Sequence, residues 1–135
     1  MKHVPKVFDI TGMIVSKVWR GAGTAIFLEL GELQGKKQQG EATISIEWSW
    51  RVDDGRKVLI GSFNEDDEIE LVIALLHGLK IDGVELYSTL PEISVHFADG
   101  KSLCSFSTVD GDPQWAIRVA NDYLYAENGL MVVGR

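Results

Sequence analysis

The side chains best suited to metal binding or nucleophilic chemistry are few in this sequence. It contains three histidines, His3, His77 and His96, and a single cysteine, Cys104. The histidines are far apart, none stands at a ligand spacing such as HxH or HxxxH, and the cysteine has no second cysteine near it. The ligand spacings of zinc, haem and iron–sulfur sites are therefore missing. We predict no metal site and no cofactor.

Cys104 also lacks a partner for nucleophilic catalysis. A two-residue turn at Asp99-Gly100 places it opposite Val95, on the apolar face of a hairpin. A buried thiol behaves as a small hydrophobic group with a raised pKa. In the same register His96 points to the other face, so we expect no Cys–His dyad. Neither GxSxG nor a glycine-rich phosphate loop is present, so we predict no catalytic residue.

Most of the carboxylates have a structural explanation. Most aspartates stand at predicted turns, where Asp caps its own backbone, and residues 65–68 begin a predicted helix. Glu47 is left in the middle of a predicted strand, where an ion pair with a neighbouring arginine is commoner than a general base. Glycosidase-type chemistry needs only two carboxylates. A hydrolytic enzyme with a site assembled from distant carboxylates is therefore the second of two alternatives to the protein-binding function that we favour below.

Two tryptophans stand two residues apart in ATISIEWSWRVDDG. Apolar and polar residues alternate over 44–52, which is the period of a half-buried strand, and Asp54-Gly55 favours a hairpin turn after it. This parity predicts that Trp48 and Trp50 both lie in the core. A β-barrel that holds a small apolar ligand is the first alternative to the protein-binding function that we favour below. The residues lining its cavity would be Trp19, Trp48, Trp50 and Trp115.

The second strand of this hairpin carries apolar residues on both faces. With a two-residue turn, Trp50 faces Leu59, while Val58 and Ile60 point to the opposite side. We therefore expect that side to be covered by the helix or by a second subunit, unless the register slips by one residue.

The strongest candidate for a binding surface lies near the carboxyl end. Turns at Asn121-Asp122 and Asn128-Gly129 put the apolar residues of three strands on one face, and they place Arg118, Tyr123 and Tyr125 on the opposite face. In this register Arg118 lies across from Tyr125, in position for a cation–π contact. Because Tyr and Arg are enriched in interface hot spots, we predict that these three residues bind a protein partner.

The elements that position these residues are mostly strands. Alternation and turn signals predict nine or ten short strands in an antiparallel meander, with a polar loop over 31–40. The strands lie at 13–19, 25–30, 44–52, 92–98, 101–108, 114–120, 123–127 and 130–134. One more strand follows the Asp54-Gly55 turn and extends to Gly61.

One segment has helical period instead. Apolar residues recur at i, i+3, i+4 and i+7 from Ile69, which predicts a helix over about 65–77 with Asn64 as N-cap and Gly78 after its end. Leu71 and Leu75 widen its apolar stripe. We expect a mainly β (α+β) fold: an antiparallel meander that curls into a barrel or half-barrel, with this central helix on the concave face or at the open end.

Composition limits the class of partner. The chain of 135 residues suits one domain, 1–135, and its net charge of -7 disfavours nucleic acid and anionic lipid as partners. Residues 1–40 hold six Lys/Arg and three Asp/Glu, while 41–135 hold seven and seventeen. The single cysteine suits a reducing compartment, and the start lacks the apolar core of a secretory signal, so we predict a cytoplasmic location.

The carboxyl-terminal half resembles a known class of domain. The stretch EISVHFADGKSLCSFSTVDGDPQWAI, followed by a short strand and NGLMVVG, is similar to several small bacterial domain families of unknown function, some of them presumed immunity proteins beside toxin systems. The resemblance implies a small acidic cytoplasmic protein that binds another protein, and it carries no functional residues. We therefore expect a non-catalytic bacterial domain that binds a protein partner or a second copy of itself, as an inhibitor or immunity-like protein.

Overall fold

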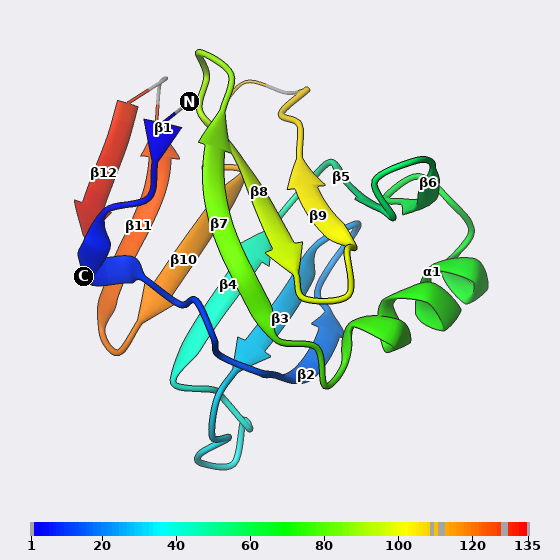
Figure 1. Cartoon of the computed structure of the whole chain (residues 1–135), viewed down its shortest axis with the longest axis horizontal. Helices are drawn as coiled ribbons and strands as arrows, with labels where there is room; N and C mark the ends of the chain where they lie inside the picture. Colours follow the sequence, from blue (N-terminus) through cyan, green and yellow to red (C-terminus); the bar gives the residue numbers. More distant parts are fainter. Residues whose placement is uncertain (1, 109, 111–112, 128–129, 135) are drawn as a thin grey trace.

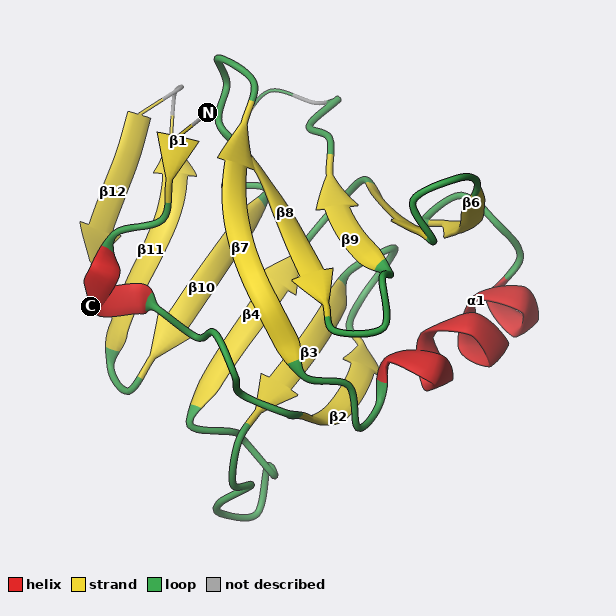
Figure 2. Cartoon of the chain, in the orientation of Figure 1, coloured by secondary structure: helices red, strands yellow, loops and turns green. Residues whose placement is uncertain are grey.

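Two antiparallel β-sheets face each other and enclose the hydrophobic core (Figures 1 and 2). The computed structural model describes residues 2–108, 110, 113–127 and 130–134. The mainly β fold with one helical segment is as expected. The described strands form two sheets and do not close into a barrel.

The first sheet contains the hairpin strands that surround the single cysteine. In spatial order its strands are β1 (Lys2–His3), β7 (Ile81–Tyr87), β8 (Glu92–Phe97), β9 (Ser102–Ser105), β5 (Trp50–Asp53) and β6 (Val58–Gly61). Strand β7 and the short β1 were not among the strands located from the sequence.

The second sheet combines strands from both ends of the chain. In spatial order they are β12 (Leu130–Gly134), β11 (Asp122–Glu127), β10 (Trp115–Val119), β4 (Ala42–Ile46), β3 (Ile26–Leu30) and β2 (Val15–Arg20). The pairing of β10 with β4 brings the carboxyl-terminal strands beside the amino-terminal ones. Its consequence is that residues far apart in the sequence share one face of this sheet.

The core between the sheets is apolar. It also receives side chains from the helix and from the segment that contains the 3-10 turn η1 (Lys6–Phe8). The largest fully buried side chains are Trp50, Trp115, Phe8, Ile10, Ile26, Leu28, Leu30, Ile44, Ile46, Ile69, Leu76 and Ile81.

The chain passes from the second sheet to the first at residues 47–49, so the prediction of one strand over 44–52 was wrong. The backbone N–H of Glu47 donates to the carbonyl of Gln114 (2.7 Å), and the Thr24 hydroxyl donates to the Trp48 carbonyl (2.5 Å). This crossing interrupts the alternation of sides. Trp50 is therefore fully buried, whereas the side chain of Trp48 is 48% exposed, contrary to its predicted core position.

The loop between β5 and β6 is longer than a two-residue turn. The Asp54 carboxylate caps the backbone N–H groups of Arg56 and Lys57, each at 2.9 Å, and Asp53 pairs with Val58. A register shift between Val52 and Asp53 then pairs Val52 with Ile60. Ile60 is buried and Val58 is exposed. The register differs from the predicted one, and this shift removes the need for a second subunit to cover Ile60.

The β8–β9 hairpin is also shifted. The backbone N–H of Phe97 donates to the carbonyl of Lys101 (2.9 Å), which closes a three-residue loop with Gly100 at φ 95°. A type I turn followed by a left-handed glycine gives this loop, whereas we predicted a two-residue turn. The shift by one residue pairs Cys104 with Ser94 in place of Val95.

The two carboxyl-terminal hairpins keep their predicted faces. Val119 pairs with Asp122, so the β10–β11 turn lies one residue earlier than predicted. The register therefore shifts by two residues, and Arg118 lies across from Tyr123, not Tyr125. A shift by two residues preserves which side each residue faces. The predicted β11–β12 register is confirmed, since Tyr123 pairs with Gly134 at one end of the hairpin and Glu127 pairs with Leu130 at the other. The predicted turn residues 128 and 129 lie outside the described residues.

The predicted helix is present but shorter. Helix α1 (Asp66–Ile73) continues into the 3-10 turn η2 (Ala74–Leu76), and Ile69 is fully buried. Its N-cap is Glu65, in a capping box with Glu68, and not Asn64. Leu71 and Leu75 are exposed, contrary to the predicted wide apolar stripe.

The helical segment lies at one lateral side of the two sheets. It is found beside strand β6 of the first sheet and strand β2 of the second, where it covers one side of the core (Figure 1). Within the described part of the chain, no helix is long and apolar enough to cross a membrane.

Candidate functional site

The outer face of the second sheet, which points away from the core, carries two neighbouring rows of side chains. Each row crosses β2, β3, β4, β10 and β11 through direct cross-strand pairs. The first row is Lys17, Glu29, Thr43, Arg118 and Tyr123, and the second is Trp19, Phe27, Ser45, Ala116 and Tyr125.

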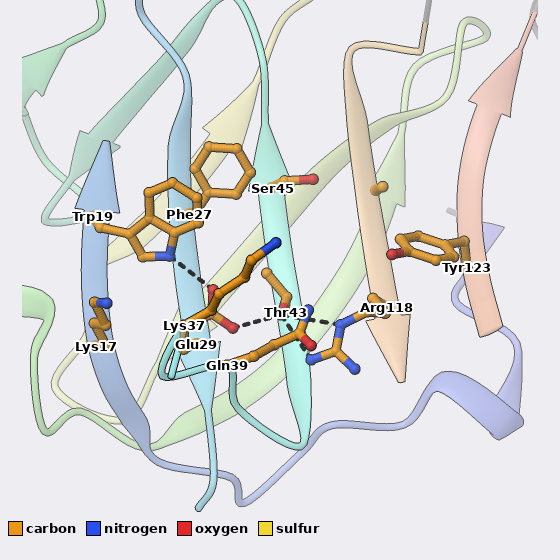
Figure 3. Close-up of a pocket in the computed structure, with 11 residues that line it drawn as sticks. Lys17, Trp19, Phe27, Glu29, Lys37, Gln39, Thr43, Ser45, Arg118 and Tyr123 are labelled. Carbon is orange, nitrogen blue, oxygen red and sulfur yellow. Dashed lines mark hydrogen bonds between the residues drawn. The ribbon is translucent and has the colours of Figure 1, made fainter. Parts of the chain in front are cut away.

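Side-chain size varies sharply along these rows. Ser45 and Ala116 are small and sit in the middle of the second row, between the aromatic pair on β2 and β3 and Tyr125 on β11. All row residues except Tyr125 line an open pocket of about 480 Å³, together with Lys37 and Gln39 from the 31–40 loop (Figure 3). We call it the outer pocket. Its volume lies within the range of ligand sites, roughly 300–1,000 Å³.

Trp19 forms one wall of the outer pocket and is held in place on two sides. Its ring stacks on Phe27, with centroids 4.0 Å apart and planes 9° from parallel. Its indole N–H donates to Glu29 Oε2 at 2.7 Å. The side chain is nevertheless 38% exposed. The stacked pair needs Gly21, since a Cβ there would come within 2.7 Å of the Phe27 ring.

Glu29 and Arg118 are buried charges that do not contact each other directly. Glu29 Oε1 accepts hydrogen bonds from the Thr43 hydroxyl (2.6 Å) and the Gly40 N–H (3.1 Å). The Arg118 guanidinium donates to Thr43 Oγ1 (2.9 Å), to the Gly40 carbonyl (2.6 Å) and to the Ala120 carbonyl (2.7 Å). Thr43 and Gly40 thus connect the two charged groups through hydrogen bonds. These bonds offset the free-energy cost of burying a carboxylate and a guanidinium.

The rim of the pocket is basic. Lys17 and Lys37 line it, and no described carboxylate lies within ion-pair distance of either ammonium group. The pocket therefore holds three cations and one carboxylate, a local excess of positive charge on a protein with a net charge of -7. Figure 3 shows Lys37 reaching across the pocket opening from its loop.

The outer pocket brings together residues from both binding hypotheses. Arg118 and Tyr123 line it, and Tyr125 lies on the same face in the next row but not among the lining residues. Of the four tryptophans only Trp19 lines it. Trp50 and Trp115 are buried in the core, and Trp48 is exposed outside the pocket.

The pocket also contains residues that were not predicted as site residues, among them Glu29, Thr43 and Phe27. Alternation within β3 would have placed Phe27 and Glu29 on one face, together with Lys17 and Trp19 of β2. Nothing in the local sequence indicates that β4 pairs with β10, and this pairing assembles the site.

The outer face of the first sheet carries a second polar cluster, created by the shifted β8–β9 register. Ser94 Oγ lies 3.3 Å from both Cys104 Sγ and His96 Nε2, while His96 Nδ1 lies 2.9 Å from Ser102 Oγ and its Nε2 lies 3.5 Å from Glu85. His96 and Cys104 thus share a face, contrary to prediction. Burial raises the pKa of the Cys104 thiol, which disfavours the thiolate needed for nucleophilic attack.

The buried carboxylates do not form an acid–base pair. Among the described residues they are Glu29 in the second sheet and Glu92 in the first, and both are engaged by hydrogen bonds. Ser105 Oγ donates to Glu92 Oε1 (2.8 Å) and the Ser107 N–H donates to Oε2 (2.8 Å). No group of three or more His, Cys, Asp or Glu side chains in the described part of the chain could hold a metal ion.

Comparison of the chain with protein-family models, with curated proteins and with solved structures found no match.

Proposed function

We propose that this protein is a non-catalytic cytoplasmic domain that binds another protein through the outer pocket, in the manner of an inhibitor or immunity protein. The observation that carries the proposal is Trp19. The residue is 38% exposed, and its indole is fixed by stacking on Phe27 and by a hydrogen bond to Glu29. A rigid, exposed aromatic residue offers a large contact area at little cost in conformational entropy, which is typical of binding surfaces.

The charges of the pocket favour recognition over catalysis. Glu29 accepts three hydrogen bonds and Arg118 donates to three different residues, so both groups have structural partners. A general base needs a free lone pair directed at the substrate. The engaged carboxylate instead orients Trp19 and anchors the 31–40 loop through Gly40.

The test is capture of the partner from native host cells by tagged protein, followed by native mass spectrometry. The variant Trp19→Ala/Tyr123→Ala should lose a stoichiometric partner that the wild type retains. Trp48→Ala is the matched control, because Trp48 is also an exposed tryptophan but lies outside the pocket. Loss of the partner in Trp48→Ala, with retention in the double variant, would move the binding surface away from the outer pocket.

A second candidate function is the binding of a small molecule, favoured by the pocket volume of about 480 Å³. Native mass spectrometry separates the two. A single chain that carries a small added mass, lost in Trp19→Ala, would support the small-molecule function, and a stoichiometric second polypeptide would support the protein-binding function.

A further inference from the structure

We infer that the group which enters the outer pocket is a carboxylate attached to a flat aromatic body. The inference rests on the proposed binding function of this pocket and adds the chemistry of its ligand. It follows from the hydrogen-bonding and charge inventory of the lining residues and from the position of the aromatic wall.

The pocket offers donors and few free acceptors. Lys17 and Lys37 have no ion-pair partner among the described residues, and each ammonium group carries three N–H donors. The one carboxylate, Glu29, already accepts from Trp19, Gly40 and Thr43. A ligand that supplies acceptors and negative charge complements such a site, whereas a cation would find only one lining carboxylate, which is already hydrogen-bonded three times.

The aromatic side of the pocket fits the rest of the ligand. Trp19 and Phe27 form a stacked wall along one side, and Ser45 and Ala116 leave a low floor beside it. A flat ring can lie on this floor against the wall, where it would meet Phe27, which stands between Trp19 and Ser45 in the row, in an offset or edge-on contact. Its carboxylate can then reach toward the basic rim.

Arg118 contributes positive charge to the pocket, but its guanidinium is already hydrogen-bonded to protein groups. Its guanidinium is buried and donates to Thr43 and to the carbonyls of Gly40 and Ala120. It therefore adds positive potential beneath the pocket while its geometry is held by the protein. The two lysines, which have no ion-pair partner in the described part of the chain, are the groups that would contact the ligand directly.

Matched probes test the inference. We would titrate the full chain with 2-naphthoate and with its neutral amide, 2-naphthamide, and follow the indole N–H resonance of Trp19, assigned with Trp19→Phe. We expect 2-naphthoate to shift this resonance and to bind about 10-fold more tightly than the amide, with an affinity that falls as salt is added.

The lysines have a matched control. Lys17→Met/Lys37→Met should reduce the affinity for 2-naphthoate to that of the amide and leave the amide unchanged. Lys57→Met/Lys80→Met removes the same charge from exposed positions outside the pocket, and it should leave the preference for the acid intact.

A pair of peptides identifies the source of the carboxylate. The capped peptides Gly-Trp-Glu-Gly and Gly-Trp-Gln-Gly carry the same aromatic body with and without the acid. A preference for the glutamate peptide would support a partner protein as the source. A response to 2-naphthoate alone would support a small aromatic acid.

The outcomes that overturn the inference differ from those that overturn the proposed function. Equal affinity for 2-naphthoate and its amide would refute the carboxylate requirement and leave the pocket as a binding surface. An unperturbed Trp19 resonance with both probes at millimolar concentration would refute the ligand class. The protein-binding function is judged separately, by partner capture with Trp19→Ala/Tyr123→Ala and Trp48→Ala.

Discussion

The outer faces of the two sheets both carry polar residues, but they use them differently. On the first sheet the Ser94 hydroxyl contacts both His96, on the same strand β8, and Cys104, on the neighbouring strand β9. On the second sheet the large side chains of Trp19 and Arg118 stand on either side of small residues. The first face satisfies its polar groups by contacts among themselves, and the second leaves a hollow whose lysines have no ion-pair partner among the described residues.

This difference suggests how a strand face becomes a site. Strand geometry alone only sends every second side chain to the outer face of a sheet. A pocket also needs unequal side-chain sizes in one row, and here the small Ser45 and Ala116 meet the stacked pair Trp19 and Phe27. It further needs buried charges that are fixed by hydrogen bonds. On the second sheet Thr43 provides this, since its hydroxyl donates to Glu29 and accepts from Arg118.

The largest expected effect follows removal of the carboxylate that supports the second face. Glu29→Ala leaves three donors, on Trp19, Gly40 and Thr43, without their acceptor. We expect it to lower the free energy of unfolding by about 2–4 kcal/mol, measured by urea denaturation. The matched change on the first face, Ser94→Ala, should cost about 1 kcal/mol or less.

Glu29→Gln sharpens this test. The amide oxygen can still accept from Gly40 and Thr43, but its NH2 group then faces the indole N–H of Trp19, which is also a donor. We expect the Trp19 indole resonance to move toward its solvent-exposed position while the 31–40 loop keeps its contacts. Equal stability of wild type and Glu29→Ala would show that the carboxylate does not support this face.

A smaller free-energy change should follow when the hollow is filled. Ser45→Phe places a ring on the pocket floor, so we expect affinity for the captured partner or for 2-naphthoate to fall by about 10-fold or more. Ser102→Phe makes the same change on the outer face of the first sheet and should leave binding unaltered. If both variants bound equally well, the hollow would not be the binding site.

The positions of most strands could be predicted from alternation, whereas their registers depended on turn geometry. The Asn128-Gly129 signal gave the correct β11–β12 pairing. The similar Asp99-Gly100 signal was compatible with both two-residue and three-residue loops, because each can use a glycine at positive φ. The difference of one residue moved Cys104 opposite Ser94 and reversed the expected relation of the cysteine to His96.

The site was predictable only in part for a related reason. Arg118 and Tyr123 were placed on the correct face because a register error of two residues preserves side-chain parity. Thr43, which contacts Arg118, stands 75 positions earlier in the chain. Since local pattern carries no information about which distant strands pair, the meeting of Arg118 with Glu29 through Thr43 could not be derived from it.

The smallest expected effect is a pH dependence confined to the first sheet. Burial raises the pKa of the Cys104 thiol above its ordinary value of about 9, and burial raises the pKa of the Tyr87 phenol to about 12. In the unfolded chain both groups release their protons at lower pH than in the folded protein. Their stabilising contribution is therefore complete below about pH 9 and is lost as the pH rises through the folded values, by at most about 1.4 kcal/mol per pH unit for each group.

Cys104→Ala separates the two groups. It should remove the decline in stability that begins near pH 9 and leave the decline that begins near pH 10 from Tyr87, measured by urea unfolding at closely spaced pH values. Tyr87→Phe should do the reverse. The same burial should make Cys104 react slowly with iodoacetamide in the folded state. Rapid alkylation, or an unchanged pH dependence of the free energy of unfolding in Cys104→Ala, would mean that the outer face of the first sheet is as accessible to solvent as the outer pocket. The contrast between the two faces would then rest on side-chain size alone.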